Sequence, residues 1–220
     1  MWKYIKSLEY PINIKNTNPK LAQYIVSQYG GPNGELGASL RYLSQRYSMP
    51  DEVSKSLLTD IGTEELAHLE MVGTLVRQLV KNATDKEIEN SNYGAYFMNH
   101  GRAVYPANSD GMPFNAASIA VSGDPITDLV EDLAAEQKAR SVYDNILRVS
   151  DDPDVNDVIK FLREREIVHF QRFGEAIHTN LRRIYPYKKY LDSCLSKHNI
   201  TILNSCLILL TDHKVQANHL

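Results

Sequence analysis

Apolar residues recur at intervals of three and four along much of the chain, which is the spacing of one face of an α-helix. The pattern is longest over residues 48–81, 124–150 and 152–185. Two shorter helices are predicted at 18–31 and 34–47, each with glycine at one end. The chain is therefore predicted to be all-α.

Capping residues, glycine and proline mark the ends of these helices. Asn18 is the expected N-cap of the first helix, with Gly30 just past its end. Ser48 and Asp51 have the spacing of a capping box and are expected to open the long helix that follows. The last helix is expected to stop before Pro186, because proline cannot continue a helix.

The lengths of the connections predict the topology. The connections near residues 48 and 151 are short, and short connections join antiparallel helices. The segment 81–123 is much longer, is rich in Asn, Gly and Pro, and has no sustained helical period. Two helical hairpins joined by one long crossover form a ferritin-like four-helix bundle, whereas a simple up-down bundle would need only short loops.

Polar residues interrupt the apolar stripes of the long helices. The stripe of 48–81 contains Glu65 and His68, and that of 152–185 contains Glu166 and His169, so both interruptions read Glu-x-x-His. The three predicted stripes are Leu57, Ile61, Glu65, His68, Val72, Leu75 and Leu79; Val155, Ile159, Leu162, Glu166, His169, Phe173 and Ala176; and Ile126, Leu129, Leu133, Glu136, Arg140, Tyr143 and Leu147.

A buried cation is the simplest explanation of these interruptions. Glu136 lies in the third stripe, and Glu35 shares a face of the 34–47 helix with Tyr42, two turns away. An ionised carboxylate buried without a partner costs several kcal/mol, so four of them in one core require a positive partner. One Glu from each of two helices, with Glu-x-x-His from each of the other two, is the general ligand pattern of ferritin-like di-iron and dimanganese proteins. The pattern predicts a dinuclear metal site and leaves iron and manganese open, since both accept these ligands.

The remaining glutamates near these motifs have an ordinary explanation. A single Glu-x-x-His is usually a solvated glutamate beside an unrelated histidine. Glu64, Glu70 and Glu164 are accordingly expected on solvated helix faces.

Composition and charge exclude several classes of protein. The chain has 220 residues, enough for one domain with a sizeable core, and a net charge of −3 with a pI of about 6.2. This charge does not indicate binding to nucleic acid or to an anionic membrane. The longest apolar run, residues 206–210, is too short to span a bilayer, and the first residues lack the apolar region of a signal peptide. Synthesis in the cytoplasm is therefore expected.

Five stretches of the sequence resemble the manganese catalases, and most closely their short spore-coat (CotJ-type) form. These stretches are MWKYIKSLEYP, GGPNGELGASLRYLSQRY, TDIGTEELAHLEMVG, DLAAEQKAR and EREIVHFQRFGEA. The resemblance covers about residues 1–185 and implies one ferritin-like domain there, with two manganese ions per chain. It implies disproportionation of hydrogen peroxide to water and oxygen. It also implies a homo-oligomer, from dimer to hexamer, located in the spore coat with other coat proteins after synthesis in the mother-cell cytoplasm. A cytoplasmic location is the alternative.

The resemblance also implies roles for individual residues. The implied metal ligands are Glu35, Glu65, His68, Glu136 and His169, with Glu65 as the bridge. Glu166 matches the glutamate that handles protons in this family, and Tyr42 matches a tyrosine that forms a hydrogen bond near the Glu35 side. Ala135 stands where some long-form members have arginine, and their long C-terminal extension has no counterpart here.

Two other functions remain open at this point. One is a structural spore-coat protein whose metal site has little or no catalytic activity. The other is an iron protein related to ferritin or rubrerythrin. Residues 186–220 match no part of the family, although the apolar, β-prone stretch TILNSCLILL indicates an interaction or aggregation segment.

Overall fold

The computed structural model describes the backbone of residues 7–184 and the side chains of residues 7–180. The chain divides into two units, Met1–His178 and Thr179–Leu220, and all the predicted site residues belong to the first. The predicted boundary between residues 185 and 186 stays a prediction, and the segment 186–220 lies outside the described residues.

Helices make up nearly all the regular structure of this range. They are α1 (Pro19–Gly30), α2 (Glu35–Gln45), α3 (Glu52–Val80), α4 (Asp85–Glu89), α5 (Gly94–His100), α6 (Pro125–Val149) and α7 (Pro153–Ile184), with 3-10 turns at Arg46–Ser48 and Ala116–Ser118. The only strand-like pairing between residues 7 and 184 is a single bridge from Ala107 to Pro113. The all-α prediction is confirmed.

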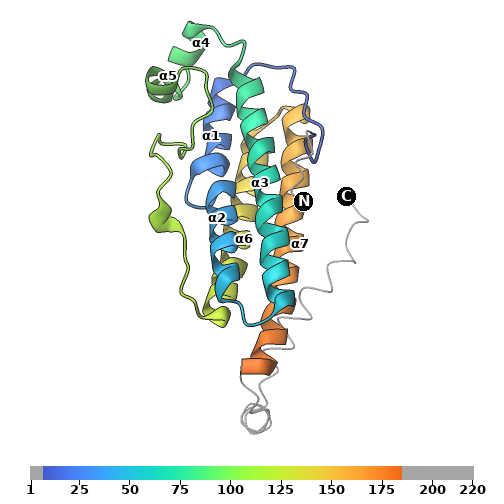
Figure 1. Ribbon diagram of the computed structural model, residues 1–220. Coiled ribbons are helices and arrows are strands. Elements are labelled where there is room, and N and C mark those ends of the chain that lie inside the picture. The colour runs from blue at the N-terminus through green and yellow to red at the C-terminus, as the bar shows by residue number, and fades with distance from the viewer. Residues whose placement is uncertain (1–6, 185–220) are drawn as a thin grey trace, which may run out of the picture. The chain divides into compact units, whose positions relative to one another are not determined.

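The long helices α3, α6 and α7 lie beside α1 and α2 in Figure 1. α1 and α2 follow one another along α3, and both pack against it. α3 and α6 run in one direction, while α2 and α7 run in the opposite direction. The segment between α3 and α6 returns along the outside of the bundle (Figure 1). The predicted ferritin-like four-helix bundle with one long crossover is therefore confirmed.

Close backbone approaches explain why glycine stands between α1 and α2. A Cβ atom at Gly34 would lie 2.6 Å from the carbonyl oxygen of Gln28. A Cβ atom at Gly30 would lie 2.3 Å from the backbone nitrogen of Ala107 in the crossover. Both distances are far inside van der Waals contact, so glycine is what allows α2 to begin at Glu35.

The predicted capping box at the start of α3 is wrong. Asp51 alone is the N-cap, and its carboxylate accepts a hydrogen bond from the backbone N–H of Ser54 at 3.0 Å. Ser48 belongs instead to the preceding 3-10 turn. Pro50 disfavours helical geometry at Met49, which is extended, so the helix cannot begin earlier. The predicted cap at Asn18 is confirmed, since its side chain accepts from the N–H of Leu21.

The crossover contains two short helices that the hydrophobic period did not predict. α4 is opened by a true capping box, in which Thr84 and Glu87 bond to each other's backbone N–H groups. Each of these helices spans at most two turns, which is too short for a period to be recognised. The predictions of length and position for the crossover are otherwise confirmed.

The predicted stripes of α3 and α7 are buried, but the stripe of α6 is partly wrong. In α3, Leu57 was predicted to be buried, but it is only partly buried and its neighbour Leu58 is fully buried. Every predicted position of α7 is buried. In α6, four predicted positions are only partly buried, and Asp132 is fully buried although it was not predicted. The four are Ile126, Leu133, Arg140 and Leu147. The buried residues of α6 are Asp128, Leu129, Asp132, Ala135, Glu136, Ala139, Tyr143 and Ile146.

Two apolar clusters occupy the two ends of the bundle core. One contains Leu75 and Leu162 among others, and the second contains Leu58 and Phe173. The polar residues predicted to form the site lie between these clusters along α3 and α7. Over the described residues, no helix is both long and apolar enough to cross a membrane.

Candidate metal centre

Four helices of the bundle contribute to one buried polar site. The residues are Glu35 on α2, Glu65 and His68 on α3, Glu136 on α6, and Glu166 and His169 on α7, none of them more than 2% exposed. Positions i and i+3 lie on the same side of a helix, so each Glu-x-x-His presents both groups to the same region of the core. The structure therefore brings together every residue that the sequence placed in the site.

The ligand atoms form two groups that share one residue. The first group is Glu35, Glu65, His68 and Glu166, and the second is Glu65, Glu136 and His169; within each group the atoms lie within 4.8 Å of one another. Glu65 belongs to both. Its two carboxylate oxygens lie 2.8 Å from Nδ1 of His68 and 2.8 Å from Nδ1 of His169. This is the position that a bridging ligand requires.

The charges in the site are poorly balanced by protein groups alone. Burial raises the pKa of Glu35, Glu136 and Glu166, and repulsion from neighbouring carboxylates raises it further. Burial alone would lower the pKa of His68, but the Glu65 carboxylate raises it to about 10. Four carboxylates thus face two imidazoles, and an added cation would favour the charged form of every carboxylate.

The residues present fit a pair of metal ions. Oε2 of Glu136 and Oε1 of Glu166 are buried and have no hydrogen-bond partner among the described residues. Buried polar atoms normally have a partner, so these oxygens indicate a missing one. Carboxylate and imidazole groups are donors that manganese and iron both accept.

Two tyrosines bind the outer carboxylates, and one of them was missed. The hydroxyl of Tyr42 donates to Glu136 Oε1 at 2.5 Å, so the expectation that placed it near Glu35 is wrong. The hydroxyl of Tyr143 donates to Glu35 instead. Each tyrosine follows a site glutamate by seven residues, and the hydrogen bonds cross between α2 and α6. The repeated spacing Glu-x6-Tyr was the signal that could have identified Tyr143.

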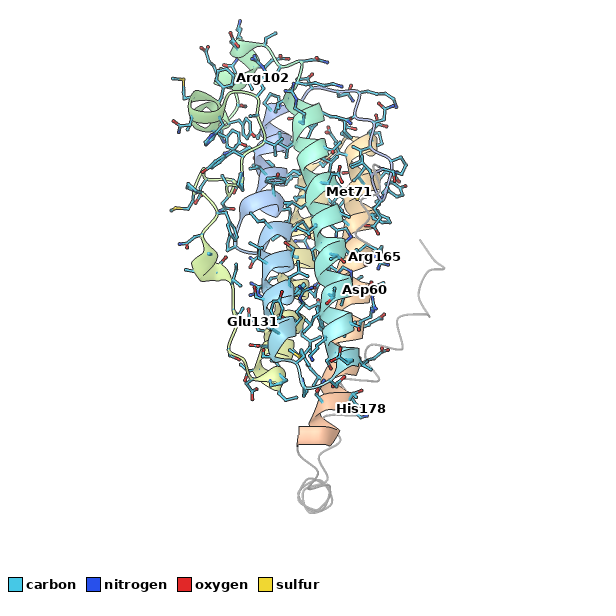
Figure 2. All side chains as sticks on the ribbon, viewed as in Figure 1. Asp60, Met71, Arg102, Glu131, Arg165 and His178 are labelled. Carbon is cyan, nitrogen blue, oxygen red and sulfur yellow. The ribbon has the colours of Figure 1, made fainter. Side chains whose placement is uncertain are left out.

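Glu64 is not on a solvated face, contrary to the prediction. Its side chain is 18% exposed and accepts a hydrogen bond from Nε of Arg165 at 2.5 Å. Arg165 is labelled in Figure 2 at the middle of the bundle, beside α3. Glu70 and Glu164 are exposed, as predicted.

Two further buried carboxylates of α6 lie outside both ligand groups. Asp128 accepts hydrogen bonds from the backbone and hydroxyl of Ser122 and from the N–H of Gly123, and so fastens the end of the crossover to α6. Burial raises the pKa of Asp132. A hydrogen bond with Gln45 and the positive charge of Arg41 act in the opposite direction and lower this pKa. Hydrophobic patterning cannot find such residues, because their partners come from other segments.

Comparison with known proteins identifies the family. A sequence model of the manganese-containing catalases matches residues 1–190. The chain belongs to the manganese-containing catalase family. It is 54% identical over 177 residues to protein CotJC of Bacillus subtilis (strain 168), which covers 80% of this chain and 93% of that protein. It is 35% identical to a probable manganese catalase of Clostridium acetobutylicum, covering 80% of each chain.

Solved structures of the family have the same fold. The crystal structure of KatB, a manganese catalase from Anabaena, superposes with a TM-score of 0.77 at 31% identity and covers 85% of this chain and 84% of that one. A dodecameric thioferritin from Bacteroides fragilis matches with a TM-score of 0.51 at 13% identity, which shows the fold alone. Family membership and the ferritin-like fold, both expected from the sequence, are confirmed.

Proposed function

We propose that the protein is a non-haem dimanganese catalase that disproportionates hydrogen peroxide to water and oxygen. Two manganese ions per chain would be held by Glu35, Glu65, His68, Glu136 and His169. The observation that carries the proposal is the position of Glu65. This residue belongs to both ligand groups, and one of its carboxylate oxygens lies 2.8 Å from Nδ1 of His68 and the other 2.8 Å from Nδ1 of His169. Membership of the manganese-containing catalase family supports the choice of manganese over iron.

The reaction needs a two-electron store and a way to move protons. A pair of manganese ions, when bound, supplies the store: oxidation of one peroxide to oxygen fills it, and reduction of a second peroxide to two waters empties it. The first half releases two protons and the second takes up two, so the site needs a group that holds and returns a proton. Glu166 is proposed for this role, because its buried carboxyl lies within the first ligand group, beside Glu35, Glu65 and His68, without being one of the proposed ligands.

The other residues of the site orient and protect it. Tyr42 and Tyr143 each donate a hydrogen bond to an outer carboxylate, which fixes the rotation of Glu136 and Glu35. The apolar clusters on both sides keep bulk water from the ligands. Electrostatic interactions are stronger in such surroundings than in water.

Manganese-loaded protein is expected to contain two ions per chain and to evolve oxygen from hydrogen peroxide. Metal analysis together with an oxygen electrode measures both quantities. Two bound manganese ions without oxygen evolution would favour a structural coat protein. Native protein that holds iron and oxidises ferrous ions without evolving oxygen would favour a ferritin-like iron protein.

One observation favours low activity. Ala135 is buried beside Glu136, at the position where some long-form members have arginine. A positive charge next to a proposed ligand is therefore missing here. The oxygen assay decides how far this lowers turnover.

The location and assembly of the protein are also proposals. Similarity to CotJC and to the CotJ-type sequences supports a place in the spore coat with other coat proteins, with the cytoplasm as the alternative. A homo-oligomer, from dimer to hexamer, is proposed from the family resemblance. No partnership with nucleic acid or a membrane is proposed.

A chain that ends at Tyr185 is expected to keep two manganese ions and most of its peroxide turnover. Every proposed ligand precedes Pro186, and the match to the family model ends at residue 190, slightly beyond the expected limit of 185. Metal content, oxygen evolution and assembly size of the shortened chain are compared with those of the full chain. Loss of the metals would show that 186–220 contributes to the site, whereas a change of assembly size alone would mark it as an interaction segment.

A further inference from the structure

Two consecutive glutamates of α3 lie on opposite sides of the same two imidazole rings. On the inner side, the oxygens of Glu65 face Nδ1 of His68 and of His169 at 2.8 Å each. On the outer side, Oε1 of Glu64 lies 3.6 Å from Nε2 of His68, and Oε2 lies 3.3 Å from Nε2 of His169. The two rings are stacked, with centroids 5.6 Å apart and planes inclined by 21°. One carboxylate thus serves each side of the pair.

Helix geometry places Glu64 between the two histidines. His68 follows Glu64 by one turn on α3, and Arg165 precedes His169 by one turn on α7. The guanidinium of Arg165 donates to Oε1 of Glu64 at 2.5 Å, which holds the carboxylate between α3 and α7. Arg165 also supplies the positive charge that this outer group of acids requires.

A second carboxylate reaches only one of the histidines. Oε2 of Glu9 lies 3.5 Å from Nε2 of His68, and the Glu9 side chain is 32% exposed. Among the described residues, Glu64 is the only carboxylate within 4 Å of Nε2 of His169. The outer partners of the two rings are therefore unequal, and His169 depends on Glu64 more than His68 does.

The tautomer of each ring follows from this arrangement. A neutral imidazole carries one proton, and the nitrogen that binds a metal is the one without it. Nδ1 of each ring lies at hydrogen-bond distance from the shared Glu65. A metal ion held there would take the unprotonated Nδ1, and the N–H of the neutral ring would then be at Nε2, where an acceptor is needed. The distances from Glu64 are slightly longer than a formed hydrogen bond, and neither buried Nε2 has a hydrogen-bond partner among the described residues.

We propose that Glu64 is a positioning residue for both metal-binding histidines. It offers one oxygen to each Nε2–H and so fixes the tautomer and the rotation of both rings at once. Such an outer hydrogen bond typically changes metal affinity by about 10–100-fold. The inference rests on the proposed dimanganese site. It assigns to one carboxylate the outer hydrogen bonds of two imidazole rings, which would otherwise require two side chains.

Glu64→Gln tests this role, because glutamine has one acceptor oxygen where glutamate has two. Its amide nitrogen cannot accept from the second imidazole. Metal-free full-length protein is titrated with Mn²⁺ against a chelator, and the dinuclear and mononuclear forms are distinguished by electron paramagnetic resonance. We expect one ion to bind with an affinity close to that of wild type and the other about 10–100-fold more weakly, with a mononuclear signal between the two steps.

Matched variants test the inequality between the two rings. Glu9→Gln is expected to change the affinity of either ion only a few-fold, because His68 keeps Glu64. The double variant Glu9→Gln/Glu64→Gln is expected to weaken both ions. Glu52→Gln, at an exposed position of the same helix, is the control and is expected to behave as wild type.

The outcomes separate this inference from the proposed function. If Glu64→Gln binds both ions with wild-type affinity, the inference about Glu64 is overturned. It is also overturned if the metal-free variant unfolds at a lower temperature but its folded chains bind both ions as wild type does, because Glu64 then serves stability alone. If Glu64→Gln does not fold, Glu64→Asp replaces it as the test. Aspartate is one methylene shorter, so both oxygens lie farther from the rings and we expect both ions to bind more weakly. Unchanged binding of both ions would again overturn the inference. A wild-type chain that binds two ions but evolves no oxygen leaves the inference intact, whereas one that binds no manganese overturns both.

Discussion

Glu166→Gln is expected to lower peroxide turnover about 10²–10⁴-fold while both manganese ions and the fold are retained. Glutamine has nearly the same shape as glutamate but cannot hold or return a proton. The side chain of Glu166 is buried within the first ligand group, where bulk water cannot easily replace it as an acid. Oxygen evolution, manganese content and the far-UV circular dichroism spectrum are measured on the same sample.

Glu164→Gln provides the control for this experiment. Glu164 is on the same helix, its side chain is 66% exposed, and it pairs with the neighbouring Arg163. We expect its turnover to match that of wild type. Unchanged turnover in Glu166→Gln would exclude Glu166 as the proton carrier. A fall in manganese content would show that Glu166 is itself a ligand, a role that its distance from Glu35, Glu65 and His68 allows.

His169→Ala is expected to reduce manganese content well below two ions per chain and to destabilise the protein. The change removes a donor from the second ligand group and leaves the buried Glu65 with less positive charge beside it. Removing one partner of a buried charged pair typically costs about 3–5 kcal/mol. Metal analysis and urea unfolding of the metal-free forms measure the two effects separately.

His178→Ala is the matched control, since His178 is an exposed histidine of α7 (Figure 2). It should change neither metal content nor stability. Full manganese occupancy in His169→Ala would remove His169 from the ligand set. Loss of stability without loss of metal would mean that the imidazole serves only as a counter-charge to Glu65.

The sequence by itself determined the features that depend on one helix at a time. The period of apolar residues located α3, α6 and α7, and the i, i+3 spacing placed Glu65 with His68 on one face of its helix. Loop lengths determined the topology, because a short connection forces antiparallel packing and a long one allows a crossover. The cost of burying unpaired carboxylates then predicted a cationic centre before any distance was known.

Only the tertiary structure decided which groups meet across helices. The helical period gives the angle of a side chain around its own axis, but not the rotation or the level of the neighbouring helix. The hydroxyl of Tyr42 therefore could not be assigned to Glu136 rather than Glu35, and Asp132 could not be recognised as buried. Glu64 lies at the edge of its helix face, where contact with α7 changes a solvated residue into the shared partner of two histidines. Such contacts depend on the packing of α3 against α7, which no local pattern in the sequence specifies.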